Sequence, residues 1–255
     1  MASLLSVENL QVQFQTKKGI NTAVDGVSFS VEKGRILGIV GESGCGKSVT
    51  SMSILQLLGS NARISGGSIK LDGKELIGLP EKEMCRIRGN DIAMIFQDPM
   101  TALNPTLTIG TQLMEPIMLH QNCGKKEAWT RAVDVLKRVG IAAPEKRMKE
   151  YPHQLSGGMR QRVMIAMAVT CEPRLLIADE PTTALDVTIQ AQILELMCEL
   201  REKMGTAIML ITHDMGVVAE TADDVLVLYA GKAVEYGSIE DIFERPKHPY
   251  TQGLL

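Results

Sequence analysis

The sequence predicts an α/β fold, with an antiparallel β unit at the start and a helical region inserted further along. Short apolar runs of strand character alternate with segments of helical periodicity, and the opening residues alternate apolar and polar side chains. A chain of 255 residues with 45% hydrophobic content can bury a substantial core. These observations favour one large domain, or one domain with a subdomain.

The composition excludes several classes of protein. The formal net charge is −3 and no lysine- or arginine-rich run stands out, which argues against a nucleic-acid partner. The five cysteines are scattered without C-x-x-C spacing, so we expect reduced thiols of a cytosolic protein and no metal site among them. The sequence lacks a secretory signal pattern, and its apolar runs are too short to span a bilayer. Any membrane role must therefore come through a partner.

The first segment reads as an antiparallel β unit. Residues 6–15 alternate apolar and polar side chains, residues 16–21 form a polar turn, and residues 23–31 resume the strand pattern. Phe14 is the only aromatic residue of the first strand. Its ring is suited either to stack on a purine base or to fill the core, and the residues alone leave both interpretations open.

A phosphate-binding loop follows. Residues 41–48, Gly-Glu-Ser-Gly-Cys-Gly-Lys-Ser, come after the apolar strand 35–40 and open a helical run at 49–58. This strand–loop–helix context is what a loop of that spacing requires, because its N–H groups and the helix N-terminus then point at an anion. Lys47 is expected to reach the β- and γ-phosphates of a nucleotide, and the Ser48 hydroxyl to bind Mg²⁺. The residues assigned here to nucleotide binding are Gly41, Ser43, Gly44, Cys45, Gly46, Lys47, Ser48 and Val49.

Cys45 has a second expected property. It lies inside the loop, at a helix N-terminus and beside Lys47. Both features lower the pKa of a thiol, so the sequence predicts a reactive cysteine whose alkylation blocks nucleotide binding.

After the first helix, residues 66–73 read as a strand ending in a turn, and residues 80–88 as a short charged helix. A second buried strand, 92–96, runs into Gln97. An uncharged amide at the end of a buried strand can bind Mg²⁺ or water and can move away when the γ-phosphate leaves. Two prolines and an asparagine predict that residues 100–105 form an irregular loop.

A helical region is inserted between two core strands. Residues 110–140 have helical periodicity, and residues 144–152 break it with prolines. The apolar stripe comprises Ala128, Ala132, Val135 and Val139. We expect a separate helical subdomain at roughly 101–168.

A second glycine-rich segment precedes another helix. Residues 155–161, Leu-Ser-Gly-Gly-Met-Arg-Gln, stand before a helix expected at 162–170. Ser156 is a natural N-cap, and Gly157 and Gly158 let a phosphate approach the exposed N–H groups. One nucleotide needs only one phosphate cradle, so a second cradle suggests a nucleotide held by another subunit. The alternative is an ordinary glycine-flanked helix start.

Two carboxylates end the buried strand 175–180. Asp179 is suited to hold Mg²⁺, and Glu180 to orient or deprotonate an attacking water. The alternative is a pair of surface acids at a strand end. Asp186 precedes a helix expected at 189–203 and serves as its cap, as a contact across a subunit boundary, or as both.

A further buried strand, 207–211, is followed by His213. A histidine at that strand end, level with the carboxylates, can hydrogen-bond the γ-phosphate. A purely structural histidine is the alternative.

Five elements, taken in this order, resemble the nucleotide-binding subunit of ABC transporters: the phosphate loop, Gln97, residues 155–158, residues 179–180 and His213. Longer segments are similar to the ATPase subunits of dipeptide, oligopeptide and nickel importers. These segments are residues 97–105, 151–159, 178–187 and 248–252, and the resemblance as a whole covers essentially the entire chain.

The resemblance implies a role for each matching position. Phe14 is expected to stack on adenine, Lys47 and Ser48 to bind phosphate and Mg²⁺, and the loop of Gln97 to contact the membrane subunits. The residues expected to close on the partner's ATP are Ser156, Gly157, Gly158 and Gln161. Glu180 corresponds to the catalytic base, Asp186 to the D-loop and His213 to the switch histidine.

The resemblance also implies the wider organisation. Residues 1–255 are expected to form one ABC-type P-loop NTPase domain that hydrolyses ATP-Mg²⁺ at composite dimer sites. The expected partners are a second, related ATPase subunit, two transmembrane permease subunits and, indirectly, a periplasmic or extracellular solute-binding protein. This places the chain peripherally on the cytoplasmic face of a bacterial membrane. Peptide importers of the family usually continue past the His-Pro-Tyr segment, often with an iron–sulfur cysteine cluster, whereas this sequence ends at Leu255. That ending fits a shortened chain or the shorter nickel-type branch, and no cluster is assigned.

Two other functions compete with an importer ATPase for di- or oligopeptides or nickel. A non-transport ABC ATPase of DNA repair, chromosome organisation or the ribosome generally carries a coiled coil, a duplicated cassette or a basic surface, and none is visible. A P-loop kinase or GTPase leaves residues 156–158 and His213 unexplained.

Overall fold

The computed structural model describes residues 3–17, 19–182 and 186–255 of the chain. These form two compact units. The first comprises Met1–Met84 and Ala207–Leu255, and the second comprises Cys85–Thr206. The boundary falls within the short helix α2 (Glu81–Ile87).

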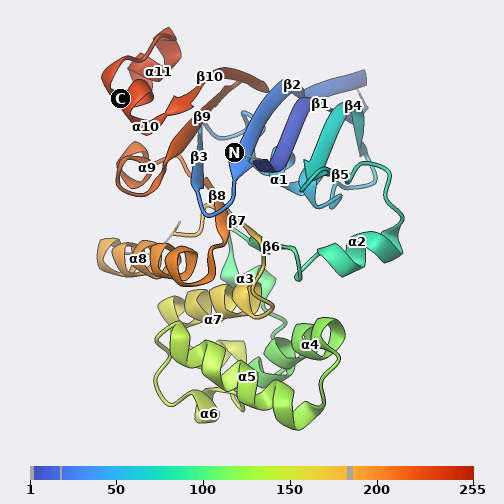
Figure 1. Cartoon of the computed structure of the whole chain (residues 1–255), viewed down its shortest axis with the longest axis vertical. Helices are drawn as coiled ribbons and strands as arrows, with labels where there is room; N and C mark the ends of the chain where they lie inside the picture. Colours follow the sequence, from blue (N-terminus) through green and yellow to red (C-terminus); the bar gives the residue numbers. More distant parts are fainter. Residues whose placement is uncertain (1–2, 18, 183–185) are drawn as a thin grey trace. The chain divides into compact units, whose positions relative to one another are not determined.

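The first unit contains an antiparallel sheet with the strand order β2-β1-β4-β5 (Figure 1). Its strands are β1 (Ser3–Thr16), β2 (Gly19–Glu32), β4 (Ala62–Leu71) and β5 (Lys74–Glu75). Inward-facing Val7, Leu10 and Val12 of β1 are fully buried, as the apolar–polar alternation predicts. The expected antiparallel β unit is therefore confirmed.

A second set of strands in the same unit has the order β10-β9-β3-β8. β3 (Ile36–Val40) lies parallel to both β8 (Ala207–Ile211) and β9 (Asp224–Tyr229), and β10 (Lys232–Ser238) is antiparallel to β9. Every residue of β3 and β8 is buried, which explains their continuous apolar sequences. The helices of this unit are α1 (Lys47–Ile54), α9 (Met215–Thr221), α10 (Ile239–Glu244) and α11 (Pro249–Leu254).

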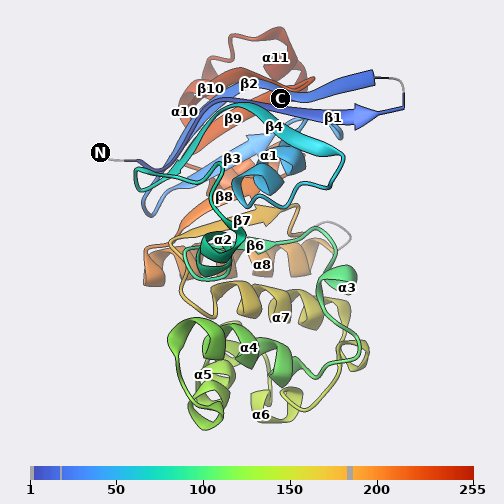
Figure 2. The same cartoon turned by 90° about the vertical axis from the view of Figure 1, so that its right-hand side faces the viewer.

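The second unit contains the parallel pair β6 (Ile92–Ile95) and β7 (Leu175–Asp179). Helices make up most of the rest (Figure 2). They are α3 (Pro99–Ala102), α4 (Ile109–Gln121), α5 (Lys125–Arg138), α6 (Pro144–Arg147), the 3₁₀ turn η1 (Pro152–Gln154), α7 (Gly157–Val169) and α8 (Val187–Met204). The predicted apolar stripe of α5 is buried.

The helical periodicity of residues 110–140 corresponds to two helices, α4 and α5, because Asn122 adopts a left-handed φ of 48° and ends α4. Two local expectations were wrong. Residues 100–105 are not wholly irregular, since Pro99 opens the single turn α3, a position that proline favours. The helix α7 begins at Gly157 rather than at residue 162, because Ser156 already serves as its N-cap.

Candidate functional site

The phosphate loop of the first unit is shaped by glycines at positions where no other residue fits. Gly41 has a φ of 149°, and a Cβ there would lie 2.2 Å from the Leu228 carbonyl oxygen. Gly46, the N-cap of α1, has a φ of 109°, and a Cβ there would lie 2.8 Å from the Ala23 carbonyl oxygen. The loop is therefore pressed against β2 and β9, and glycine is required for that close approach.

The same loop is open toward solvent where an anion would bind. Ser43, Gly44 and Ser48 are exposed, and α1 carries no side-chain cap and no acidic residue in its first turn. Its N–H groups and the positive end of its dipole therefore remain available to an anion.

Lys47 lies folded against the loop. It is only 5% exposed, and its Nζ donates to the carbonyl oxygens of Gly41, at 2.6 Å, and Glu42, at 3.0 Å. These two carbonyls hold a buried ammonium group beside the anion-facing N–H groups. A lysine so placed supplies the positive charge that a phosphate needs.

The expected low pKa of Cys45 was wrong. The thiol is buried, and burial raises its pKa above the ordinary value, against the opposing effects of the Lys47 charge and of backbone hydrogen bonds. The sequence showed the charge and the helix terminus but not the burial. Cys45 stays assigned to the nucleotide loop as a prediction.

His213 lies at the same strand ends as the phosphate loop. β3 and β8 are parallel neighbours that pair Ile39 with Ile211, and the Thr212 N–H donates to the Ile39 carbonyl at 3.1 Å. The exposed His213 thus follows β8 where the loop follows β3. Adjacent parallel strands therefore bring the loop and His213 to one edge of the sheet, where α/β folds bind ligands.

Phe14 is half-buried in β1, opposite Asn21 of β2 and Ala62 of β4. Its role in adenine stacking stays a prediction.

The second unit brings Gln97 and Glu180 together. β6 and β7 are parallel and pair Ile95 with Ala178, so both polar side chains follow the carboxyl ends of neighbouring strands. The Gln97 Nε2 donates to the Glu180 Oε2 at 2.9 Å. Glu180 has a left-handed φ of 47°, a conformation that costs about 1 kcal/mol or more in a residue with a side chain. Such strain next to a buried acid, Asp179, marks a candidate catalytic position.

The start of α7 has the geometry that its sequence predicts. Ser156 is extended, and its Oγ accepts from the Met159 N–H at 3.4 Å. A Cβ on Gly157 would meet no atom within 4 Å, so this face of the first turn is bare. Gln161 is 1% exposed, and its Nε2 donates to the Pro181 carbonyl. This bond ties the helix to the residue that follows Glu180.

Asp186 is a helix cap. Its Oδ1 accepts from the Ile189 N–H at 3.0 Å at the start of α8. The preceding residues 183–185, part of the segment that resembles the importer family, lie outside the described residues.

The side chains assigned to Mg²⁺ are oxygen donors: the Ser48 hydroxyl, the Gln97 amide and the Asp179 carboxylate. Hard oxygen ligands of this kind suit Mg²⁺, which usually combines one or two protein oxygens with substrate phosphates and water. Within residues 3–17, 19–182 and 186–255, no group of three or more His, Cys, Asp or Glu side chains is placed to hold a metal. The donor set therefore fits a nucleotide-borne Mg²⁺ better than a protein-only metal cage.

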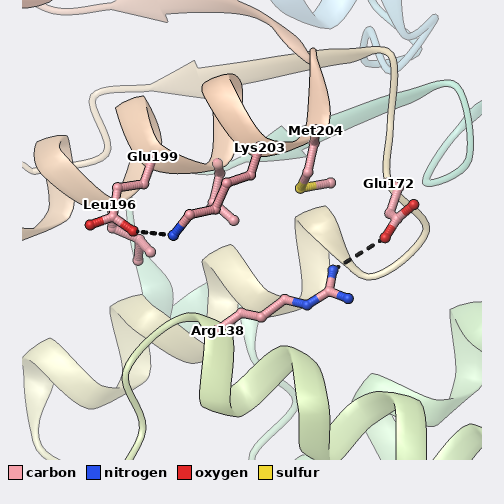
Figure 3. Close-up of a pocket in the computed structure, with 7 residues that line it drawn as sticks. Arg138, Glu172, Leu196, Glu199, Lys203 and Met204 are labelled. Carbon is pink, nitrogen blue, oxygen red and sulfur yellow. Dashed lines mark hydrogen bonds and ion pairs between the residues drawn. The ribbon is translucent and has the colours of Figure 1, made fainter.

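A pocket of about 470 Å³ in the second unit contains none of these residues (Figure 3). Its charged side chains already form ion pairs, Arg138 with Glu172 at 3.2 Å and Lys203 with Glu199 at 2.7 Å. We assign it no ligand.

Sequence reasoning missed two contacts near the candidate site. It did not anticipate the hydrogen bond between Gln97 and Glu180, although their equivalent positions after strands gave a signal. It also missed Tyr250, whose hydroxyl oxygen accepts from the Glu42 N–H at 2.9 Å. No local pattern links two residues 208 positions apart.

Among the described residues, no helix is both long and apolar enough to cross a membrane.

The loop, the carboxylates and the capped glycine helix define a nucleotide-binding ATPase cassette, and comparison with known proteins supplies its family. The family model for the ABC transporter matches residues 24–183. The chain therefore belongs to the ABC transporter family.

Particular relatives extend this likeness along the whole chain. The Bacillus subtilis oligopeptide transport ATP-binding protein AppD is 58% identical, over 100% of this chain and 78% of its own length. The Bacillus subtilis dipeptide transport ATP-binding protein DppD is 59% identical, over 100% of this chain and 76% of its own length. The Escherichia coli oligopeptide transport ATP-binding protein OppD is 55% identical, over 99% and 75% respectively.

Solved structures share the fold. CbiO1 from Clostridium perfringens, part of an ABC transporter complex, superposes with a TM-score of 0.81 at 28% identity, covering 96% of this chain and 92% of its own. The cassette MJ0796, solved as a dimer bound to ADP and Pi, superposes with a TM-score of 0.82 at 27% identity, covering 92% of this chain and 98% of its own. The predicted α/β cassette fold with β and helical parts is confirmed.

Proposed function

We propose that this chain is the ATP-hydrolysing subunit of an ABC importer for dipeptides or oligopeptides. The observation that carries the proposal is its 58–59% identity, along the whole chain, to proteins named for oligopeptide and dipeptide transport. The sequence resemblance also allowed nickel as the solute and a non-transport ATPase as the class. The names of these relatives favour peptides and transport.

ATP binding is the work of the first unit. The N–H groups at Ser43, Gly44, Gly46 and Val49 surround the phosphates, and Phe14 stacks on the adenine. Lys47 exchanges the carbonyls of Gly41 and Glu42 for the β- and γ-phosphates, which satisfy the same charge more strongly. His213 donates a hydrogen bond to the γ-phosphate.

Turnover depends on the second unit. Glu180 is the general base that accepts a proton from the attacking water, and Gln97 occupies one of its oxygens until that water arrives. Ser48, Gln97 and Asp179 supply oxygen ligands for Mg²⁺. Mg²⁺ bound there neutralises charge on the β- and γ-phosphates.

The active form contains two cassettes. The bare first turn of α7 supports a site that completes a partner's nucleotide, with Ser156, Gly157 and Gly158 facing the phosphate and Gln161 bracing the turn from inside. Asp186 contributes at the boundary between subunits. The dimer of MJ0796 supports this arrangement, for which we propose a related second ATPase subunit as the partner.

The remaining assembly follows from this role. We propose residues 1–255 as one ABC ATPase domain with a helical subdomain at roughly 101–168. It binds two transmembrane permease subunits, works indirectly with a periplasmic or extracellular solute-binding protein, and sits peripherally on the cytoplasmic face of a bacterial membrane.

A tagged pull-down from solubilised native membranes tests the assembly. We expect two multi-spanning proteins and a second ATPase, identified by mass spectrometry. Recovery of ribosomal or DNA-bound proteins without a membrane partner would overturn the importer proposal.

Replacing the proposed base tests the chemistry. In Glu180→Gln we expect ATP turnover to fall by about 10²–10⁴-fold, because a general base contributes that much, while ATP binding persists and the closed dimer accumulates. Glu172→Gln, a change at an exposed carboxylate of the same unit, is the control. Wild-type turnover in Glu180→Gln would sink the assignment.

A further inference from the structure

The C-terminal helix α11 reaches the phosphate loop through Tyr250. The backbone N–H of Glu42, the second residue of the loop, donates to the Tyr250 hydroxyl oxygen at 2.9 Å. The Glu42 carbonyl accepts from the buried Lys47 ammonium at 3.0 Å. Both backbone polar groups of Glu42 are therefore engaged: the N–H by α11, and the carbonyl by the loop's own lysine and by the Cys45 N–H at 3.2 Å.

The ring of Tyr250 packs against a second tyrosine at the end of β9. Its ring lies 4.5 Å from that of Tyr229, with the planes tilted by 44°. Tyr229 follows Leu228, whose carbonyl oxygen closes over Gly41 at the start of the loop. Aromatic pairs at this separation attract each other, so Tyr229 at the end of β9 fixes the position of the Tyr250 ring. The Tyr250 hydroxyl is then placed to bond the phosphate loop.

The segment before Tyr250 is anchored to β10. The two carboxylate oxygens of Glu235 accept from the N–H groups of Lys247, at 2.8 Å, and His248, at 3.1 Å. The His248 Nδ1 in turn accepts from the Tyr250 N–H at 3.2 Å and caps α11. Although burial opposes it, hydrogen bonding to the ionised carboxylate lowers the pKa of Glu235, so this anchor stays charged at neutral pH. The chain of contacts thus runs from β10 to the phosphate loop.

A third contact holds the loop from the turn between β9 and β10. The Gly231 N–H donates to the Cys45 carbonyl at 3.0 Å. Removing the Tyr250 hydroxyl would leave this contact intact and free only the Glu42 end of the loop. A change confined to the Tyr250 hydroxyl therefore isolates one support of the nucleotide site.

We propose that Tyr250 is a positioning residue for nucleotide binding: it holds the Glu42 peptide so that the other loop N–H groups and Lys47 face the phosphates. The inference rests on the proposed function, since it concerns the affinity of that same loop. It gives the His-Pro-Tyr segment a task within the subunit, separate from the composite dimer site. A neutral hydrogen bond of this kind is worth a threefold to tenfold change in affinity, by order of magnitude.

Calorimetric titration with ADP and Mg²⁺, which bind without turnover, tests the proposal on the full chain. In Tyr250→Phe, which keeps the ring against Tyr229, we expect Kd to rise by about threefold to tenfold. Glu235→Gln, which loosens the anchor, should give a smaller rise in the same direction. The matched control is Tyr236→Phe, because the Tyr236 hydroxyl also bonds a backbone group, the Ser30 carbonyl at 3.2 Å, in the β region of the same unit.

A second readout separates positioning from a general loss of stability. The side chain of Cys45, a residue of the loop, is 5% exposed, so its labelling by N-ethylmaleimide, followed by peptide mass spectrometry, reports loop opening. We expect faster labelling of Cys45 in Tyr250→Phe and no change in Tyr236→Phe. If Tyr250→Phe matches wild type in Kd and in Cys45 labelling, or only lowers the unfolding temperature, the inference is overturned. If the wild type itself fails to bind ADP, the proposed function fails instead.

Discussion

The two glycine-rich helix starts of this chain, those of α1 and α7, are built differently. At α1 the N-cap is Gly46 in a left-handed conformation, with no side-chain cap, and the buried Lys47 supplies a cation. At α7 the N-cap is Ser156, extended and bonded through its own hydroxyl to the Met159 N–H, and the glycines lie inside the first helical turn.

The difference shows which of the two can hold an anion alone. The α1 loop combines free N–H groups, a helix dipole and a buried cation in one unit. The α7 turn offers N–H groups and a dipole beside a bare surface, and the basic residue of its first turn, Arg160, is less buried than Lys47. It is therefore suited to complete a phosphate site that another chain has already formed. Changes at α1 should act on binding, and changes at α7 on turnover.

The largest expected effect comes from Gly41→Ala. Its Cβ would lie 2.2 Å from the Leu228 carbonyl oxygen, so β9 or the loop must move. We expect ADP affinity, measured by calorimetry, to fall at least about a hundredfold and the free energy of unfolding to fall by about 1–3 kcal/mol. Gly26→Ala, a change in β2 outside the loop, is the control, since its Cβ meets no atom within 4 Å and adds only the strain of its φ of 73°. Equal losses in both variants would show that the close approach is not what matters.

Gly157→Ala should separate turnover from binding. Nothing lies within 4 Å of the added Cβ, and alanine favours a helix over glycine, so the chain should be as stable or about 0.5–1 kcal/mol more stable. We expect ATP turnover of the assembled transporter to fall about tenfold or more, because the methyl group meets the partner's phosphate, while ADP binding by the single chain is unchanged. Gly124→Ala, an open glycine at the start of α5, is the control. Normal turnover in Gly157→Ala would remove α7 from the composite site.

Ser156→Ala should have a smaller effect. Loss of the cap costs about 0.5–1 kcal/mol of unfolding free energy, at the low end because the bond is long, and turnover should fall severalfold. Ser238→Ala removes the equivalent cap of α10, in which Ser238 Oγ accepts from the Asp241 N–H at 3.2 Å. Chemical denaturation should show similar losses in both variants, with turnover lowered only in Ser156→Ala. Equal turnover in the two would mean that Ser156 is a cap and nothing more.

A final prediction concerns the thiol chemistry of the α1 loop, which leaves binding and turnover unchanged. Burial raises the pKa of Cys45, so its thiolate fraction at pH 7 lies below that of an ordinary thiol and grows as the pH rises through the raised value. Cys85 is exposed. We expect N-ethylmaleimide to label Cys85 about tenfold faster or more at pH 7, and bound ADP to slow Cys45 further. Fastest labelling at Cys45 would restore the low pKa that the sequence suggested.

Local sequence predicted much of the candidate site. The spacing of residues 41–48 predicted the loop, apolar runs predicted the strands that end at Gln97, Asp179 and His213, and cap chemistry predicted Ser156. These features depend on neighbouring residues, whose steric and hydrogen-bonding preferences act over a few positions. The ends of helices were less predictable from sequence. Asn122, in a left-handed conformation, ends a helix within a segment whose apolar periodicity continues on both sides.

The sequence by itself determined the family, the presence of an ATP-binding loop and the order of the candidate site segments, because each segment consists of residues close together in the chain. Only the tertiary structure decided three further points: that Cys45 is buried, that Gln97 bonds Glu180, and that Tyr250 reaches the Glu42 amide. Burial and hydrogen bonds between distant residues depend on how strands and helices fold back on one another. A local sequence pattern therefore does not predict which distant residues will come into contact.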